Sequence, residues 1–366
     1  MRAVAGLFGL VFVPLLLTAC AGEDPATALL ADYRERMARV LDVDAPPLEP
    51  PALAPWPRPR VRTVAIPEQR VDLLDFLDLQ ACGLGPLIAE RSSALGRVKE
   101  PSQRLRYELE FLARADACLT PAADAGNADA GPDDETRALL AELLDAKRAA
   151  LGAVIWNATL GDAALAADFA LDVQPLAPTR VRGAGREATG AVHRLAQIAA
   201  QGGQAGEAPG DDWEAPWAAL AHDRFGGRAR RSVALLTAVL ADVADWLEAR
   251  ERERPLCPLG RPTPDARILL NLFTRYYAGA VQPYLAAVST ETQRWLDALA
   301  ALLAAQRLAP PAEFEAAVAG LLGGAGRGTE WQALVAARDR HTRAWQTLLG
   351  ACDLAPRRPA AARTES

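Results

Sequence analysis

The chain has 366 residues, of which 51% are hydrophobic and 23% are charged. An apolar share of this size is enough for a large core, and the length is compatible with two domains or with one extended helical domain. The formal net charge of −6 argues against a nucleic-acid or anionic-lipid surface as the main partner, because such surfaces repel an acidic protein.

The first 19 residues are typical of a secretory signal. Arg2 precedes an apolar run over residues 3–17, and the sequence LTAC follows as a lipobox that ends at Cys20. The alternative, an uncleaved transmembrane anchor, is disfavoured because the run has 15 residues, whereas a bilayer needs about 20. We therefore expect residues 1–19 to be a signal peptide and Cys20 to carry a lipid anchor.

The residue after Cys20 is Ala21. In many Gram-negative bacteria an aspartate at this position retains a lipoprotein in the inner membrane, so its absence favours the outer membrane. We expect the protein to lie on the periplasmic face, attached through its lipid. No other apolar run approaches 18 residues, so we expect the rest of the chain to be soluble.

Four further cysteines allow three disulfide pairings, and the periplasm favours disulfides. We expect neighbours in the sequence to pair, Cys82 with Cys118 and Cys257 with Cys352, and the other two pairings are alternatives. Free thiols or a metal site are disfavoured because no C-x-x-C spacing occurs. We expect no metal and no cofactor.

The mature chain divides into three segments. Residues 20–43 comprise the lipidated N-terminus and a short helix that starts near Pro25. Residues 44–67 are rich in proline, which favours an extended conformation. This segment is a spacer, a recognition motif for another protein, or a strap that buries Trp56, and we favour the strap. Residues 68–366 form the helical periplasmic domain.

Helical periodicity covers most of this last segment, which predicts an all-α, irregular multi-helix domain stapled by two disulfides. Capping-box spacing marks helix starts at Thr290 and Thr329. Turn-rich stretches predict loops between the helices. The expected helices lie near residues 71–78, 86–95, 103–119, 140–155, 193, 233–249 and after 263, and the expected loops lie at 120–133, 183–190 and 202–210.

Motifs for catalysis are weak. Two glycine-rich stretches, 183–185 and 323–328, superficially suggest phosphate-binding loops. Neither follows a predicted strand and neither has the lysine of a P-loop, so we expect flexible loops. The pair His222 and Asp223 is better explained by chance than by a serine-type triad. The sequence therefore assigns no catalytic residue.

The first candidate site is a polar cluster near the expected Cys82–Cys118 disulfide. Its charged and hydroxyl groups are candidates for a ligand cleft, and its two carboxylates would suit an envelope hydrolase. The alternative, which we favour, is that these groups cap helices and pair internally. The candidate cleft comprises Glu90, Arg91, Ser92, Ser93, Tyr107 and Glu108.

The second candidate site is an aromatic cluster around Pro283. Core packing beside a proline kink is the simpler interpretation, and an exposed groove for a partner peptide or glycan is the alternative. The candidate partner surface comprises Phe273, Tyr277, Tyr284 and Trp295.

Residues 73–112 read LLDFLDLQACGLGPLIAERSSALGRVKEPSQRLRYELEFL, and they are followed by Cys118 and by VQPYL at 281–285. With these features, the lipobox and the proline-rich segment, the chain resembles a set of uncharacterised proteobacterial lipoproteins, the domain of unknown function numbered three thousand and eighty. The resemblance covers nearly the whole chain. It implies a lipoprotein with one helical domain and supplies no activity. Many relatives have asparagine where this chain has Ser92, which weakens a catalytic interpretation.

Together these features predict a protein that binds or scaffolds in the cell envelope. The expected partners are the membrane, through the lipid anchor, and an envelope protein or glycan, with no nucleic acid. A hydrolase with a cleft near Glu90 and Glu108 is the alternative. The sequence leaves the substrate, the specific partner and the oligomeric state open.

Overall fold

The computed structural model describes residues 24–68, 79–120, 132–202, 210–323 and 328–355. Within these ranges every regular element is helical, which confirms the predicted all-α fold. Cys20 and the signal lie outside the described residues, as does most of the loop expected at 120–133.

The helical elements follow one another along the chain. In order they are α1 (Pro25–Leu41), α2 (Pro59–Arg62), η1 (Leu79–Cys82), α4 (Gly85–Ser92), η2 (Gly96–Val98), α5 (Pro101–Leu119), α6 (Asp134–Ala158), α7 (Ala163–Asp168), η3 (Pro178–Arg180), α8 (Arg186–Gln201), α9 (Ala215–Asp223), α10 (Phe225–Glu253), α11 (Pro264–Leu272), the π-helical stretch η4 (Phe273–Val281), α12 (Gln282–Ala304), α13 (Ala312–Leu322) and α14 (Thr329–Ala351).

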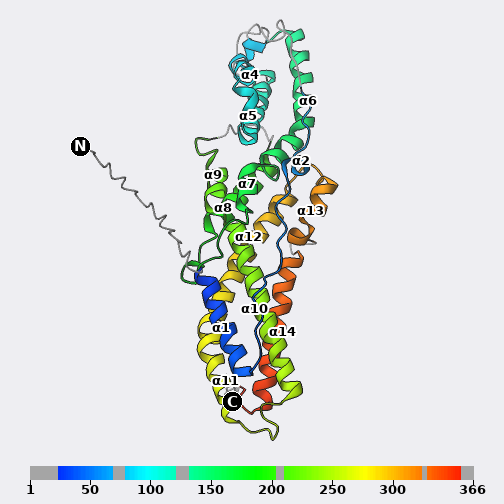
Figure 1. The fold of residues 1–366 in the computed structure, drawn as a ribbon. Helices are drawn as coiled ribbons and strands as arrows, with labels where there is room; N and C mark the ends of the chain where they lie inside the picture. The colour runs from blue at the N-terminus through cyan, green and yellow to red at the C-terminus, as the bar shows by residue number, and fades with distance from the viewer. Residues whose placement is uncertain (1–23, 69–78, 121–131, 203–209, 324–327, 356–366) are drawn as a thin grey trace, which may run out of the picture.

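The molecule is elongated, with a long helical bundle and a smaller unit at one end (Figure 1). We call the bundle of α1 and α7 to α14 the body, and we call α4, α5 and the first part of α6 the head. With 25 residues, α6 is about 38 Å long and joins the two. Its Lys147 contacts Glu108 of α5 in the head, and its Trp156 ring lies 5.1 Å from the Phe314 ring of the body.

The centre of the body is α10, which packs against α14, α1 and α12. Its first turn contains Gly226, where a Cβ atom would lie 2.4 Å from the Trp295 ring and 2.8 Å from the Asp168 carboxylate. No side chain fits at that distance. The glycine therefore allows α10 to approach α12 and the end of α7 closely.

The proline-rich segment runs along the body (Figure 1). Trp56 is buried, and its ring is stacked on Phe169 with the ring centroids 4.1 Å apart. The backbone of the segment is also held, because the Arg230 guanidinium donates to the Ala54 carbonyl oxygen at 2.7 Å. These contacts make the segment a strap on the surface of the bundle rather than a free spacer.

Both disulfides have the expected pairing. The bond between Cys257 and Cys352 joins the loop after α10 to the end of α14, so it closes one end of the body. The bond between Cys82 and Cys118 joins η1 to the last turn of α5 in the head.

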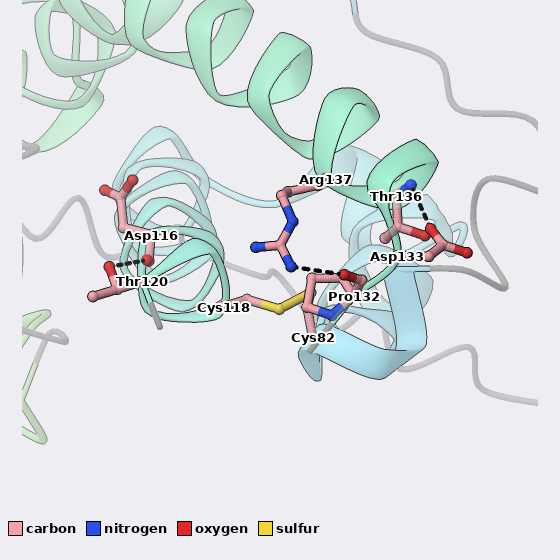
Figure 2. Close-up of a disulfide and its surroundings, with 8 residues drawn as sticks. All are labelled: Cys82, Asp116, Cys118, Thr120, Pro132, Asp133, Thr136 and Arg137. Atoms are coloured by element: carbon pink, nitrogen blue, oxygen red, sulfur yellow. Dashed lines mark hydrogen bonds between the residues drawn. A yellow bond between two sulfur atoms is a disulfide. The ribbon is translucent and has the colours of Figure 1, made fainter. Parts of the chain in front are cut away.

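Figure 2 shows that the head disulfide lies beside the start of α6. The Asp133 carboxylate caps this helix by accepting the Thr136 backbone N–H at 2.8 Å. The Arg137 guanidinium donates to the Pro132 carbonyl oxygen at 3.0 Å. The covalent link between η1 and α5 is thus adjacent to the point where the chain enters α6.

Two predicted helix boundaries are wrong. Thr290 lies inside α12, and its hydroxyl donates to the Ala286 carbonyl oxygen one turn earlier, a bond that a helix-interior threonine can make instead of a cap. Gly190 lies inside α8, which begins at Arg186, so the loop expected over 183–190 is shorter. Thr329 does begin α14, although the residue in the cap position is Gly328.

One helical stretch of the described chain, 134–168, is long and apolar enough to cross a membrane by length and composition. This differs from the expectation that no further run approaches 18 residues. The most apolar window has a mean hydropathy of 1.3, and 61% of it is buried inside the fold. That burial explains the composition as that of a core helix.

Candidate functional site

A groove of about 730 Å³ lies between α8 and α12. Arg182 and Arg186, in and after the turn that leads into α8, line it together with Thr189. Thr290 and Arg294 of α12 line the opposite wall. The two walls are about 100 residues apart in the sequence, and packing between α8 and α12 brings them together.

The lining of the groove is basic. Arg182 and Arg186 have no hydrogen-bonding or ion-pairing partner within the part of the chain that the structure describes. Arg294 donates to the Glu291 carboxylate at 3.1 Å, and the Glu291 side chain is 8% exposed. Among the described lining residues, three arginines therefore stand against one carboxylate, although the whole chain carries a net charge of −6.

Glycines shape the turn before α8. Gly183 has a φ of +77°, a left-handed conformation that glycine adopts without strain. At Gly185 a Cβ atom would lie 2.7 Å from the Phe225 ring, so this position admits no side chain. The two glycines thus fix the path of the backbone between Arg182 and Arg186.

The N-terminus of α8 is already occupied by a carboxylate of the chain itself. The Ala188 backbone N–H hydrogen-bonds to Asp223. Burial raises the pKa of the Asp223 carboxyl, and Arg228, at 3.7 Å, and this N–H partly offset the increase. An anion in the groove would therefore be held by arginine side chains and not by the helix terminus.

Such a lining suits the binding of an anion. Each guanidinium presents a planar set of donors that matches a carboxylate or a phosphate, and a threonine hydroxyl can add a further donor. The lining also contains two side chains that could take part in acid–base chemistry, His193 and Glu291. The Glu291 carboxylate is already paired with Arg294, however, so it is not free to act as a base. Across the described ranges, no group of three or more His, Cys, Asp and Glu could hold a metal ion.

The predicted cleft residues lie in the head, and those of α4 make local contacts. The Ser93 hydroxyl donates to the Glu90 carbonyl oxygen at 2.7 Å, and Arg91 donates to the Gly96 carbonyl oxygen at 3.0 Å. The Glu90 carboxylate pairs with Lys99, which lowers the pKa of that carboxyl. Ser92 is exposed.

Of the predicted cleft residues on α5, Glu108 is buried and Tyr107 is partly buried. The Glu108 carboxylate accepts from Lys147 at 2.7 Å and from Arg104 at 2.6 Å. Burial and the adjacent Glu108 raise the pKa of Tyr107 to about 12. The carboxylates of Glu90 and Glu108 thus both have basic partners, which agrees with the interpretation that these groups pair internally. The hydrolase at Glu90 and Glu108 stays a prediction.

The aromatic cluster belongs to the core. Tyr277, Tyr284 and Trp295 are 6%, 3% and 0% exposed. Phe273 is partly buried, with its ring 4.9 Å from that of Trp345. Their burial agrees with the simpler interpretation of core packing, and an exposed groove for a peptide or glycan cannot be built from the three buried side chains.

A protein-family model described as "Protein of unknown function (DUF3080)" matches residues 30–356. The chain belongs to this family. The DUF3080 match includes the head, the body, both disulfides and the groove, and it confirms the family resemblance predicted from the sequence. No curated protein and no solved structure matches the chain.

Sequence reasoning missed the groove of this DUF3080 chain. The stretch TRVRGAGR at 179–186 places arginines on both sides of the two glycines, and this was a usable signal for an anion site. The absence of a preceding strand and of a P-loop lysine argued against a phosphate loop. The second wall, from Thr290 to Arg294, has no motif of its own.

A buried polar cluster in the body was also missed. His341 of α14 is fully buried, and its Nε2 lies 2.9 Å from the Tyr33 hydroxyl and 3.2 Å from the Trp345 Nε1. Because an indole N–H can only donate, we assign Nε2 as the acceptor and the proton to Nδ1, which has no partner in the described ranges. Burial lowers the pKa of His341 to about 3. The imidazole is thus a neutral, internal link between α1 and α14.

Proposed function

We propose that this DUF3080 protein is a lipid-anchored protein of the bacterial envelope that acts by binding or scaffolding, and that the groove between α8 and α12 binds an anionic ligand. The lipobox that ends at Cys20 supports the location. The basic lining of the groove carries the binding proposal.

The groove brings Arg182 and Arg186 together with Arg294 in one hollow, and the first two have no hydrogen-bonding or ion-pairing partner in the described ranges. Unpaired cations in a hollow attract counter-ions from solution, and a ligand with an anionic group replaces those counter-ions. Glu291 pairs with Arg294 and leaves the other two arginines without a carboxylate partner. The lining therefore supports binding of an anion more directly than hydrolysis.

Binding is tested by isothermal titration calorimetry with inorganic pyrophosphate as the probe. The variant Arg182→Gln/Arg186→Gln/Arg294→Gln should bind it about tenfold more weakly or worse, since each exposed charge pair contributes up to about 1 kcal/mol. The matched control is Arg39→Gln/Arg261→Gln/Arg343→Gln, which removes three exposed arginines elsewhere. Equal affinity of the two variants would contradict the proposal.

Location is tested by fractionating cells that express the wild-type chain or Cys20→Ser. The wild-type protein should sediment with the outer membrane, and labelling with a fatty acid should mark it. The variant should lose the label, because the serine offers no sulfur for the lipid. A label that persists in Cys20→Ser would show that the anchor is elsewhere.

A further inference from the structure

We infer that the anionic group bound in the groove is the phosphate of a phospholipid headgroup in the membrane leaflet that holds the anchor. This inference rests on the proposed function, because it uses both the lipid on Cys20 and anion binding by the groove. Three observations support it: the reach of the tether, the contact of α1 with the helical segment that leads into α12, and the donor set.

The tether is short. Cys20 precedes Asp24 by four residues, which span at most about 15 Å even when fully extended. Asp24 itself is fixed, because its carboxylate caps α1 by accepting the backbone N–H groups of Ala26 and Thr27 at 3.1 and 2.9 Å. The membrane surface must therefore lie close to the first turn of α1.

The start of α1 lies about halfway along the body and not at its end (Figure 1). An anchor at this position favours an arrangement with the side of the bundle, and not its tip, near the membrane. The stretch η4 packs against α1 and continues directly into α12. The wall of the groove is thus built on the same helical segment that contacts α1.

The Asp24 carboxylate also acts on a residue next to the groove. Burial is the main reason why the pKa of the Tyr284 phenol is raised, and Asp24 adds to that increase. Tyr284 lies in the first turn of α12, two residues before Ala286 and six before Thr290, both of which line the groove. At 1.5 Å per residue these positions are about 3 Å and about 9 Å further along the helix axis, so the groove wall begins within two turns of the residue that Asp24 affects.

The donors of the groove fit a phosphate better than a lone carboxylate. A phosphate offers several acceptor oxygens, which can be shared among Arg182, Arg186 and Arg294. The groove also has a small apolar part from Ala286 and Ala287, suited to the glycerol carbons next to a headgroup phosphate. Neither the arginines nor the two alanines select for any part of the headgroup other than its phosphate.

The net charge of −6 predicts that most of the protein surface avoids an anionic membrane. Charges further away than about 8 Å are largely screened at physiological salt, so the local excess of arginines decides the contact at the groove. We therefore expect membrane contact through the groove to be specific in position and strongly weakened by added salt.

The experiment measures co-sedimentation of unlipidated protein with vesicles. The chain that begins at Ala21 retains every described helix, and without the lipid its binding reports on the groove alone. Vesicles of phosphatidylcholine are compared with vesicles that also contain phosphatidylglycerol, with and without inorganic pyrophosphate as competitor. The proteins are the wild type, Arg182→Gln/Arg186→Gln/Arg294→Gln, and the control Arg39→Gln/Arg261→Gln/Arg343→Gln, with circular dichroism as the check on folding.

The inference predicts that the wild type binds phosphatidylglycerol vesicles and that pyrophosphate displaces it. The groove variant should bind these vesicles roughly 100-fold more weakly. The control variant should bind them as the wild type does. If pyrophosphate binds in the groove but the vesicles do not, the lipid inference is wrong and the proposed function stands. If neither binds, both are wrong. Vesicle binding that survives in the groove variant overturns the inference, because another surface is then responsible.

Discussion

In the head, Glu108 and Lys147 form an ion pair in which the two side chains are 5% and 8% exposed, and Arg104 contacts the second carboxylate oxygen. In the body, the buried Arg230 pairs with Glu330, whose side chain remains 18% exposed. A pair buried at both ends loses the hydration of both charges, whereas the body pair keeps part of it. Removing one partner of the pair should therefore lower the stability of the head more than the equivalent change lowers that of the body.

The interior of the body is stabilised instead by aromatic rings, together with two buried ionisable side chains, Asp168 and His341. Trp295 donates to Asp168 at 3.0 Å, and the Gly226 backbone N–H donates to the same carboxylate at 3.0 Å. Burial raises the pKa of Asp168 to about 7, and His341 is neutral. Because aromatic packing is distributed over many contacts, we expect the body to unfold as one unit and the head to open at lower free energy.

The largest effect should come from Trp295→Ala in the body. This variant removes a fully buried indole that packs against Phe169 with ring centroids 4.9 Å apart, and it removes the side-chain donor to Asp168. We expect the free energy of unfolding to fall by about 4 kcal/mol, measured by denaturant unfolding. Trp246→Ala, in which the lost ring is only partly buried, is the control and should cost less than half as much. Similar losses in the two variants would argue against an aromatic basis for body stability.

The disulfides provide the second comparison. Removing the head bond with Cys82→Ser/Cys118→Ser should lower stability by about 3 kcal/mol, and hydrogen exchange should accelerate in α4 and α5 while α10 stays protected. Removing the body bond with Cys257→Ser/Cys352→Ser should instead lower the global unfolding transition. If exchange in α10 accelerates equally in both variants, the head and the body form a single cooperative unit.

Local patterns predicted much of this architecture. Helical periodicity indicated an all-α fold, and the order of the cysteines favoured the pairing that the structure has. Trp56 in a proline-rich segment indicated a strap because an indole there needs a surface to cover it. Each of these inferences depends on residues that are close in sequence or on a small set of alternatives.

Features that depend on tertiary packing could not be predicted in the same way. The groove needs α8 and α12 to pack side by side, and nothing in the stretch around Arg186 indicates that Arg294 lies opposite. Thr290 had the spacing of a cap but lies inside a helix, because continuous packing of α12 outweighs a local signal. One partner of Glu108, Lys147, likewise comes from a separate helix.

The third prediction concerns the head pair. Lys147→Met leaves the buried Glu108 with Arg104 alone and should lower the stability of the head by about 2 to 3 kcal/mol, measured by hydrogen exchange of α5. Combining it with Glu108→Gln should recover at least half of that loss, because no unpaired charge then remains buried. Arg114→Gln, which removes an exposed pair, is the control and should cost less than about 1 kcal/mol. A double variant less stable than Lys147→Met would contradict a compensating pair.

The smallest effect is a dependence on pH in the body. His341 has a folded pKa of about 3 and an unfolded value of 6.5, so the unfolded chain binds the proton more readily between these values. Its contribution to stability is therefore present above pH 6.5 and is lost as the pH falls. From about pH 6.5 to about pH 5 the loss should be about 2 kcal/mol.

Asp168 should act in the opposite direction over the same interval. Its folded pKa of about 7 exceeds the usual 3.8, so its contribution is present below pH 3.8 and is lost as the pH rises through about 7. The two groups therefore offset each other in the wild type, and the pH dependence of the wild type alone would conceal both. The difference in unfolding free energy between the wild type and His341→Phe isolates the histidine, and it should shrink by about 2 kcal/mol on acidification over that range. A difference that stays constant with pH would mean that the imidazole can be protonated inside the body, and His341 would then not be a neutral link between α1 and α14.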